Sequence, residues 1–126
     1  MTKIYNTNNE IIFEDENLSL KELVEKNKSN LNYANLSGAD LRGANLEDAD
    51  LRRANLRGAN LEGADLRFAN LTGANLRFAD LAAANLEREN LKNANLNYAK
   101  YSSQTVYSCG KTVGELVKNG GNNEQK

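Results

Sequence analysis

The chain has 126 residues, of which 40% are hydrophobic and only 6% aromatic, and it contains no Trp, Pro or His. Without histidine, the sequence excludes Ser-His and Cys-His catalytic pairs and offers no imidazole as an acid, base or metal ligand near neutral pH. The single cysteine, Cys109, excludes an intrachain disulfide framework and cysteine-rich zinc sites. The formal net charge of −1 gives no whole-molecule field that would attract nucleic acid or an anionic membrane.

The length fits one domain, and no stretch approaches the roughly 18 apolar residues that a membrane span needs. The N-terminus has no continuous apolar core and no small-residue cleavage pattern, so we expect no signal peptide. A lone cysteine also fits a reducing compartment. We therefore expect a cytoplasmic protein without membrane contacts.

A short β-hairpin is predicted at the start of the chain. Apolar residues stand on both sides of a polar run, residues 6–10, as is typical of two strands joined by a turn. The flanking apolar residues are Ile4, Tyr5, Ile11, Ile12 and Phe13.

A short helix is predicted next, at about residues 19–27. Ser19 and Glu22 have the spacing of a capping box, in which each side chain accepts a hydrogen bond from the other residue's backbone. The residues on its apolar face are Leu20, Leu23 and Val24. We expect residues 1–28 to form an N-terminal cap whose helix plugs the end of the structure that follows.

A repeat of five residues fills the chain from residue 29 to residue 100. Leucine recurs at every fifth position, fourteen times without a gap, from Leu31 to Leu96. Asn or Asp precedes each leucine, and the position two before it holds a small residue in every unit except the one with Glu89. The unit reads Ala-(Asp/Asn)-Leu-x-x.

Period five fits neither common element. On an α-helix, successive leucines would lie about 140° apart and encircle the axis. On a flat strand, an odd period would send them to alternate faces. If the backbone turns by about 90° per unit, however, four units make one coil and every leucine points towards its axis.

Residues 29–98 resemble the pentapeptide-repeat proteins, through fourteen consecutive units. The resemblance implies an all-β fold, a right-handed quadrilateral β-helix over residues 29–100, with Leu as the central inward residue and Ala as the second. Fourteen units correspond to about three and a half coils. The small residue fits where the wall is tight.

Glycine stands at the second place after leucine in five units, which predicts type II turns, because their third residue needs a positive φ. These glycines are Gly38, Gly43, Gly58, Gly63 and Gly73. The corners that hold Arg53, Phe68, Phe78 or Arg88 are expected to be of a type that avoids positive φ. Around Glu89, whose carboxylate is costly to bury, we expect a bulge or an opened corner.

The segment after the repeat is predicted to form a C-terminal cap over residues 101–120, followed by a disordered tail, residues 121–126. Thr112 and Glu115 have capping-box spacing for a second short helix. The apolar residues offered by this cap are Tyr101, Tyr107, Val113, Leu116 and Val117. The cap folds back over its own last coil or pairs with a second copy, and the resemblance favours a homodimer.

Because four units make one coil, residues that are twenty positions apart in the repeat should lie one above the other. This spacing predicts which exposed side chains stack. Glu47, Arg67 and Glu87 form an alternating ion ladder, whereas Arg88 and Arg53 lie beside Phe68 and Tyr33 at cation–π range. The candidate interaction surface is formed by Phe68, Phe78, Tyr98, Arg57 and Arg77. The alternative is that these side chains only stabilise one another.

No motif supports catalysis. The sequence Gly110-Lys111-Thr112 ends like a phosphate-binding loop, but Thr105 occupies the position of the first glycine. Asp40 and Asp80 share a face but are separated by Asn60, so no carboxylate pair is expected. We expect no enzyme, no cofactor and no metal.

Some bacterial members of the family that the chain resembles imitate DNA and bind DNA gyrase or another type II topoisomerase. That mechanism needs a long, strongly negative rod, whereas residues 29–100 carry nine acidic and nine basic residues. Direct nucleic-acid binding by Arg52, Arg53 and Arg57 is opposed by the neighbouring Asp48 and Asp50. The favoured interpretation is a non-catalytic scaffold or protein-interaction module, bacterial or phage-borne, with an unknown protein partner and the DNA mimic as the alternative.

Overall fold

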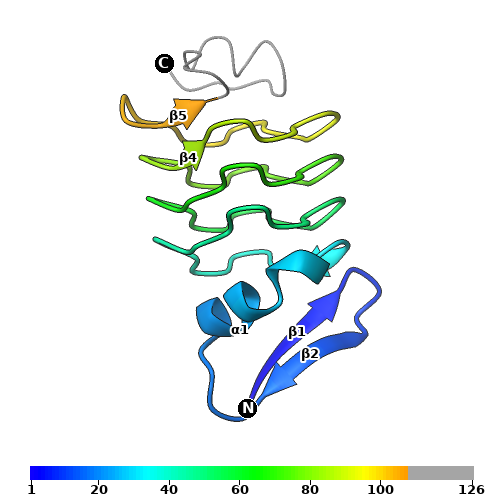
Figure 1. Ribbon diagram of the computed structural model, residues 1–126. Coiled ribbons are helices and arrows are strands. Elements are labelled where there is room, and N and C mark those ends of the chain that lie inside the picture. Colours follow the sequence, from blue (N-terminus) through cyan, green and yellow to red (C-terminus); the bar gives the residue numbers. More distant parts are fainter. Residues whose placement is uncertain (108–126) are drawn as a thin grey trace.

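In the computed structural model, which describes residues 1–107, the repeat winds the chain into a stack of coils above a hairpin and a short helix (Figure 1). The elements are β1 (Thr2–Asn6), β2 (Ile11–Asp15), α1 (Leu20–Lys26), a 3-10 turn (Lys28–Asn30), β3 (Ala34–Asn35), β4 (Asn85–Leu86) and β5 (Val106–Tyr107). Most of the repeat pairs through single parallel bridges rather than through long strands.

Backbone hydrogen bonds join each coil to the next in a register of twenty residues. The parallel bridges run from Asn35↔Asn55 to Asp80↔Lys100 without interruption. Within each unit the N–H after the corner donates back to the leucine carbonyl, as from Ala39 to Leu36 at 3.1 Å. One such turn every five residues gives four corners per coil, so the predicted four-sided coil is present.

The leucines and alanines of the repeat fill the interior of the coils. Every repeat leucine from Leu31 to Leu96 is at most 6% exposed, and every repeat alanine from Ala34 to Ala94 is at most 8% exposed. They form one continuous hydrophobic core along the stack. The predicted inward positions are confirmed.

The Asn or Asp before each leucine has a structural role of its own. In thirteen units, from Asn35 to Asn95, its Oδ1 accepts the backbone N–H two residues later at 3.0–3.3 Å. Both side chains provide this acceptor, whereas longer or apolar side chains do not. The bond fixes the start of each corner and explains why the two residues interchange.

The prediction for the non-glycine corners is wrong. Positive φ occurs at the third residue of all fourteen corners, including Arg53 (57°), Phe68 (62°), Phe78 (61°) and Arg88 (58°). The reason is the bonding between coils: the Arg53 N–H donates to the carbonyl of Thr72 at 2.8 Å, and equivalent bonds hold most other corners. The ladder imposes one corner conformation whatever the side chain, against the local preference.

Of the two distortions expected at Glu89, the bulge is absent. Asn90 keeps the register with Asn70, and its N–H donates to the Ala69 carbonyl at 3.0 Å. The corner itself is wider, because the bond from the Glu89 N–H to the Leu86 carbonyl is 3.4 Å, against 2.9–3.1 Å in the other units. Glu89 is partly exposed as a residue, but the Oε2 atom of its carboxylate is buried, so part of this carboxylate bears the cost of desolvation.

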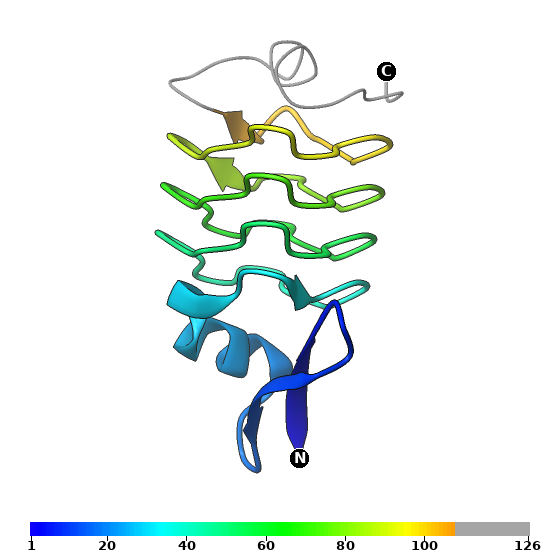
Figure 2. The ribbon, with the colours of Figure 1, turned by 90° about the vertical axis from the view of Figure 1, so that its right-hand side faces the viewer.

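The hairpin and the helix lie at the N-terminal end of the stack (Figure 2). Strand β1 pairs antiparallel with β2 and, on its other edge, with β3, where Tyr5 faces Asn35. Helix α1 begins at a complete capping box between Ser19 and Glu22. Its buried residues Leu23 and Val24 belong to the same core as the leucines.

The ladder continues beyond Lys100, the predicted end of the repeat. Strand β5 pairs in parallel with β4, and Asn85 faces Val106, which is one residue further than the register of twenty. Tyr101 is buried, and the Thr105 hydroxyl donates to the Leu81 carbonyl at 2.8 Å. The predicted C-terminal helix with Val113, Leu116 and Val117, and the tail 121–126, lie outside the described residues.

Replacing Leu66 with Ala should lower the free energy of unfolding by about 2–5 kcal/mol, because the cavity lies in a fully buried stack. Glu62→Ala, at an exposed corner position, should change it by less than about 0.5 kcal/mol. Urea denaturation measures both. A loss below about 1 kcal/mol for Leu66→Ala would contradict a packed leucine stack.

Adjacent alanines test the strain at the corners. Ala83 has a φ of 57° and Ala82 is not among the positive-φ residues. Glycine relieves the left-handed strain of roughly 1–2 kcal/mol but loses about 0.5–1 kcal/mol to chain entropy. Ala83→Gly should therefore stabilise by up to about 1.5 kcal/mol, whereas Ala82→Gly should destabilise by about 0.5–1 kcal/mol. Equal destabilisation by both, in thermal unfolding, would argue against corner strain.

Candidate interaction surface

Four columns of exposed side chains run along the coils, because residues twenty apart stack at each corner. We name each column after one of its residues. The Arg53 corner holds residues 32–33, 52–53, 72–73 and 92–93, and the Arg57 corner holds residues 37–38, 57–58, 77–78 and 97–98. The Glu62 corner holds residues 42–43, 62–63 and 82–83, and the Phe68 corner holds residues 47–48, 67–68 and 87–88.

An aromatic pair stands on the Arg57 corner, as predicted. Phe78 and Tyr98 lie on consecutive coils with ring centroids 5.1 Å apart and ring planes 8° from parallel. Each residue is 47% exposed. Since the coil register fixes their backbones, the two rings form a rigid apolar step on the surface.

Two arginines flank this aromatic pair. The guanidinium carbon of Arg57 lies 4.8 Å from the Phe78 ring centroid, and that of Arg77 lies 5.4 Å from Phe78 and 5.8 Å from Tyr98. Gly58 stands one coil before Phe78 and adds no side chain there, which leaves room for Arg57. The Nε of Arg77 is buried without a hydrogen-bond partner, so the ring contacts replace a polar bond.

Phe68 does not join this cluster. It is 50% exposed on the Phe68 corner, a different column from Phe78 and Tyr98. Within residues 1–107, the cation–π contacts are confined to the Arg57 corner. The expected contacts of Phe68 with Arg88 and of Tyr33 with Arg53 are therefore wrong.

Ion pairs form mainly within single units. Three arginines each bind, through Nε and Nη2, the carboxylate two residues earlier, in the pairs Asp40–Arg42, Asp50–Arg52 and Asp65–Arg67. The predicted ion ladder of Glu47, Arg67 and Glu87 contributes less to ion pairing, since Arg67 lies 3.6 Å from Glu47 but 2.7 Å from Asp65. The sequence signal for these pairs is an Asp at the position before leucine and an Arg directly after it.

These pairs hold their carboxylates ionised. Hydrogen bonds from the side chain and backbone of Arg42 lower the pKa of Asp40 to about 2. Side-chain hydrogen bonds from Arg52 and Arg67 lower the pKa values of Asp50 and Asp65 in the same way. Carboxylates of lowered pKa are poor general acids near neutral pH.

No arrangement for catalysis or metal binding is found in the part of the chain that the structure describes. A pocket of about 600 Å³ between α1 and the Glu62 corner is lined by Ser19, Leu20, Lys21, Asp40 and Arg42. Its one carboxylate is the one bound to Arg42, and Asp80 instead lies 3.8 Å from Lys100. Residues 1–107 hold no group of three metal-binding side chains and no helix with the length and apolar character to cross a membrane.

A family model for pentapeptide repeats matches eight copies over residues 29–67, 49–88 and 69–100, more than half of the chain. The chain belongs to the pentapeptide repeat family. Its fold is accordingly a right-handed β-helix, as expected from the repeat. Comparison with curated proteins found no match.

Two crystal structures of pentapeptide repeat proteins are similar to this β-helix. One, from the thylakoid lumen of Arabidopsis thaliana, is 32% identical with a TM-score of 0.59, and the match covers 70% of this chain and 57% of that protein. The other, from Nostoc PCC 7120, is 38% identical with a TM-score of 0.52, and the match covers 71% and 76%. The chain thus spans just over half the length of the thylakoid protein.

The ion pairs predict acid sensitivity. The folded pKa values of Asp40, Asp50 and Asp65 lie below their ordinary value of about 3.9. The stability that they contribute is therefore present above about pH 4 and is lost as the pH falls towards 2. The triple variant D40N/D50N/D65N keeps the Oδ1 acceptors, and urea denaturation at pH 6 and 2.5 should show a smaller acid loss than in the wild type. Equal losses would contradict the role of these pairs.

Proposed function

We propose that the chain is a non-catalytic protein-interaction module that docks its partner on the Arg57 corner. The observation that carries this proposal is the half-exposed Phe78–Tyr98 pair with its two flanking arginines. Aromatic and arginine side chains are the types most enriched at the centres of protein interfaces. Because the coils hold these side chains in place, little conformational entropy is lost when a partner binds.

The same surface has an alternative role, in which the stack only stabilises the fold. Cation–π contacts at exposed sites contribute about 0.5–1 kcal/mol, and aromatic pairs add about as much. These contacts could also form between rings that are more deeply buried, however, so they do not account for the exposure of Phe78 and Tyr98, which is 47% for each residue. The proposal therefore assigns the exposed part of the rings to a partner.

Two structural roles accompany the proposal. Residues 1–28 act as the N-terminal cap, supported by the burial of Leu23 and Val24 against the repeat core. The segment from residue 101 closes the other end or pairs with a second copy, supported by the continuation of the ladder to β5. Fourteen units in a register of twenty correspond to about three and a half coils.

The DNA-mimic function is disfavoured. It rests on family resemblance alone, and the repeat is neutral overall. The most prominent exposed cluster, moreover, presents arginines rather than carboxylates. A surface of that kind does not imitate a phosphate backbone.

Affinity capture from bacterial lysate tests the docking surface. We expect at least one protein to be retained by the wild type and by E62R, on another corner, but lost from R57E/R77E. Far-ultraviolet circular dichroism and thermal unfolding verify that both variants fold. Identical captured proteins for all three baits would refute docking at the Arg57 corner, and a type II topoisomerase retained by all three would support the alternative function.

A further inference from the structure

The neutrality of the repeat hides a separation of charge. The Arg53 and Arg57 corners, with the walls that lead into them, hold five basic residues and two carboxylates. These are Arg52, Arg53, Arg57, Arg77 and Lys92, with Asp50 and Glu89. The other two corners and their walls hold seven carboxylates and four basic residues. Nine charges of each sign are thus distributed as +3 on one half of the β-helix and −3 on the other.

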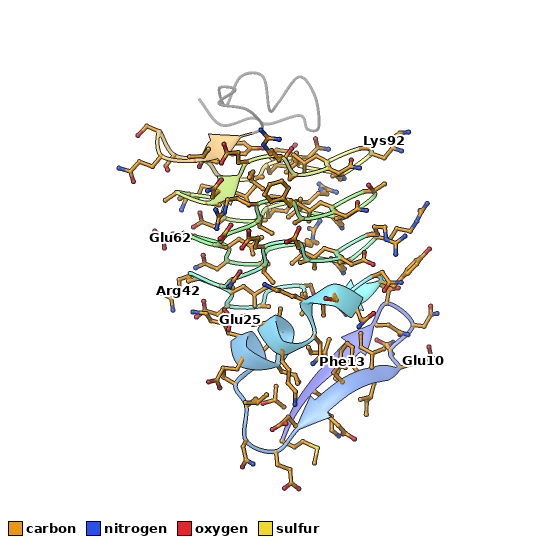
Figure 3. The ribbon with its side chains drawn as sticks, viewed as in Figure 1. Glu10, Phe13, Glu25, Arg42, Glu62 and Lys92 are labelled. Carbon is orange, nitrogen blue, oxygen red and sulfur yellow. The ribbon has the colours of Figure 1, made fainter. Side chains whose placement is uncertain are left out.

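Side-chain positions agree with this division. In Figure 3, Lys92 projects from one side of the coils, whereas Glu62 and Arg42 project from the opposite side. We call the Arg53 corner, the Arg57 corner and the wall between them the basic face. Along that wall run only asparagines, Asn35, Asn55, Asn75 and Asn95.

The two halves also differ in how many of their cations form ion pairs. On the acidic half, Arg42, Arg67 and Lys100 lie within 4 Å of carboxylates. On the basic face, Arg52 is paired with Asp50. The remaining cations there, Arg53, Arg57, Arg77 and Lys92, form no salt bridge among residues 1–107. Four cations of one face thus keep their charge available for a ligand.

The aromatic pair adds positive edges to this face. One face of Phe78 is stacked on Tyr98, and Arg57 lies over the ring as well, so the exposed part of Phe78 is mainly its edge. An aromatic ring is negative on its face and positive at its edge. Cations and ring edges together offer positive potential beside an apolar step, which suits a carboxylate next to an apolar side chain.

We propose that the basic face binds an acidic segment of a protein partner, rich in Asp and Glu with interspersed apolar residues. The proposal rests on the proposed function and names the chemistry of its partner. Charge complementarity selects the segment and raises its rate of association, and the Phe78–Tyr98 step packs against its apolar side chains. At the first coil, the basic face ends in Tyr33 and Ser37, which carry no charge.

Nucleic acid fits this face less well. Sequence-tolerant binding of single strands depends on ring faces on which bases stack, and here Phe78 and Tyr98 stack on each other. Duplex binding needs a row of several phosphate contacts, whereas the basic face has four unpaired cations in a chain of net charge −1. A carboxylate ligand makes use of both the cations and the apolar step.

Fluorescence anisotropy with defined probes tests the proposal. The probes are a labelled peptide that alternates Glu with Leu or Phe, the same peptide with Gln for Glu, and a labelled single-stranded oligonucleotide of equal charge. We expect the acidic peptide to bind at least about tenfold more tightly than the other two at low salt, and its affinity to fall as salt is raised.

Matched variants locate the binding site. Arg53 and Arg88 are matched in position, because each is the second residue after a leucine, with φ of 57° and 58°. Both are exposed, and neither has a salt bridge within residues 1–107. Arg53→Glu, on the basic face, should weaken peptide binding several-fold, whereas Arg88→Glu should not. R57E/R77E should weaken it by about tenfold or more, and R57Q/R77Q to a lesser degree, with folding verified by thermal unfolding.

Three results would overturn the proposal: no binding of the acidic peptide, equal weakening by the substitutions at Arg53 and Arg88, or tighter binding of the oligonucleotide. The last would assign the basic face to nucleic acid. If lysate capture still depends on Arg57 and Arg77 while the acidic peptide does not bind, docking at the Arg57 corner stands and only the acidic chemistry is wrong. If the peptide binds but R57E/R77E binds it equally well, the acidic-segment proposal fails, and lysate capture decides separately whether a partner docks at the Arg57 corner.

Discussion

The backbone ladder between coils is the constraint on which the rest of the structure depends. A leucine N–H donates to a carbonyl of the next coil, as from Leu36 to Asn55 at 2.7 Å, and the Asn55 N–H donates to Ala34 at 2.8 Å. Because these bonds recur in a register of twenty residues, each coil must copy the shape of the one before it. Buried leucines, tight alanine walls and uniform corners are consequences of that copying.

The interior could be predicted from the sequence because its signal is strictly periodic. The fourteen leucines and the small residues two places before them leave one axis as the common direction. Corner conformation could not be predicted in the same way. Local preference argues against positive φ at Phe68 or Arg88, but a single corner of another shape would break the bonds to both neighbouring coils. The ladder therefore outweighs a local cost of roughly 1–2 kcal/mol.

The candidate surface was predictable in its stacking and less so in its electrostatics. Aligning residues that are twenty positions apart places Phe78 next to Tyr98 and Arg57 next to Arg77, as the structure shows. This alignment does not reveal that Arg67 forms its hydrogen bonds with Asp65, two residues earlier in the same unit, and lies farther from Glu47 on the neighbouring coil. Nor does a total charge count show the basic face, whereas the same count made corner by corner does.

This architecture separates what keeps the chain folded from what it presents to a partner. Leucine and alanine fill the core, and the Oδ1 atom of Asn or Asp holds each corner. The side chains of the two residues after each leucine therefore make few packing contacts in the interior. Their one backbone constraint is the positive φ of the second, which Phe78, Tyr98 and Arg53 adopt as Gly58 does, at a local cost that the ladder outweighs. A large side chain at such a position has no partner in the core. An aromatic or arginine side chain there, held at half exposure in a fixed register, is therefore available for contacts outside the chain, which is the physical basis of the proposed interaction surface.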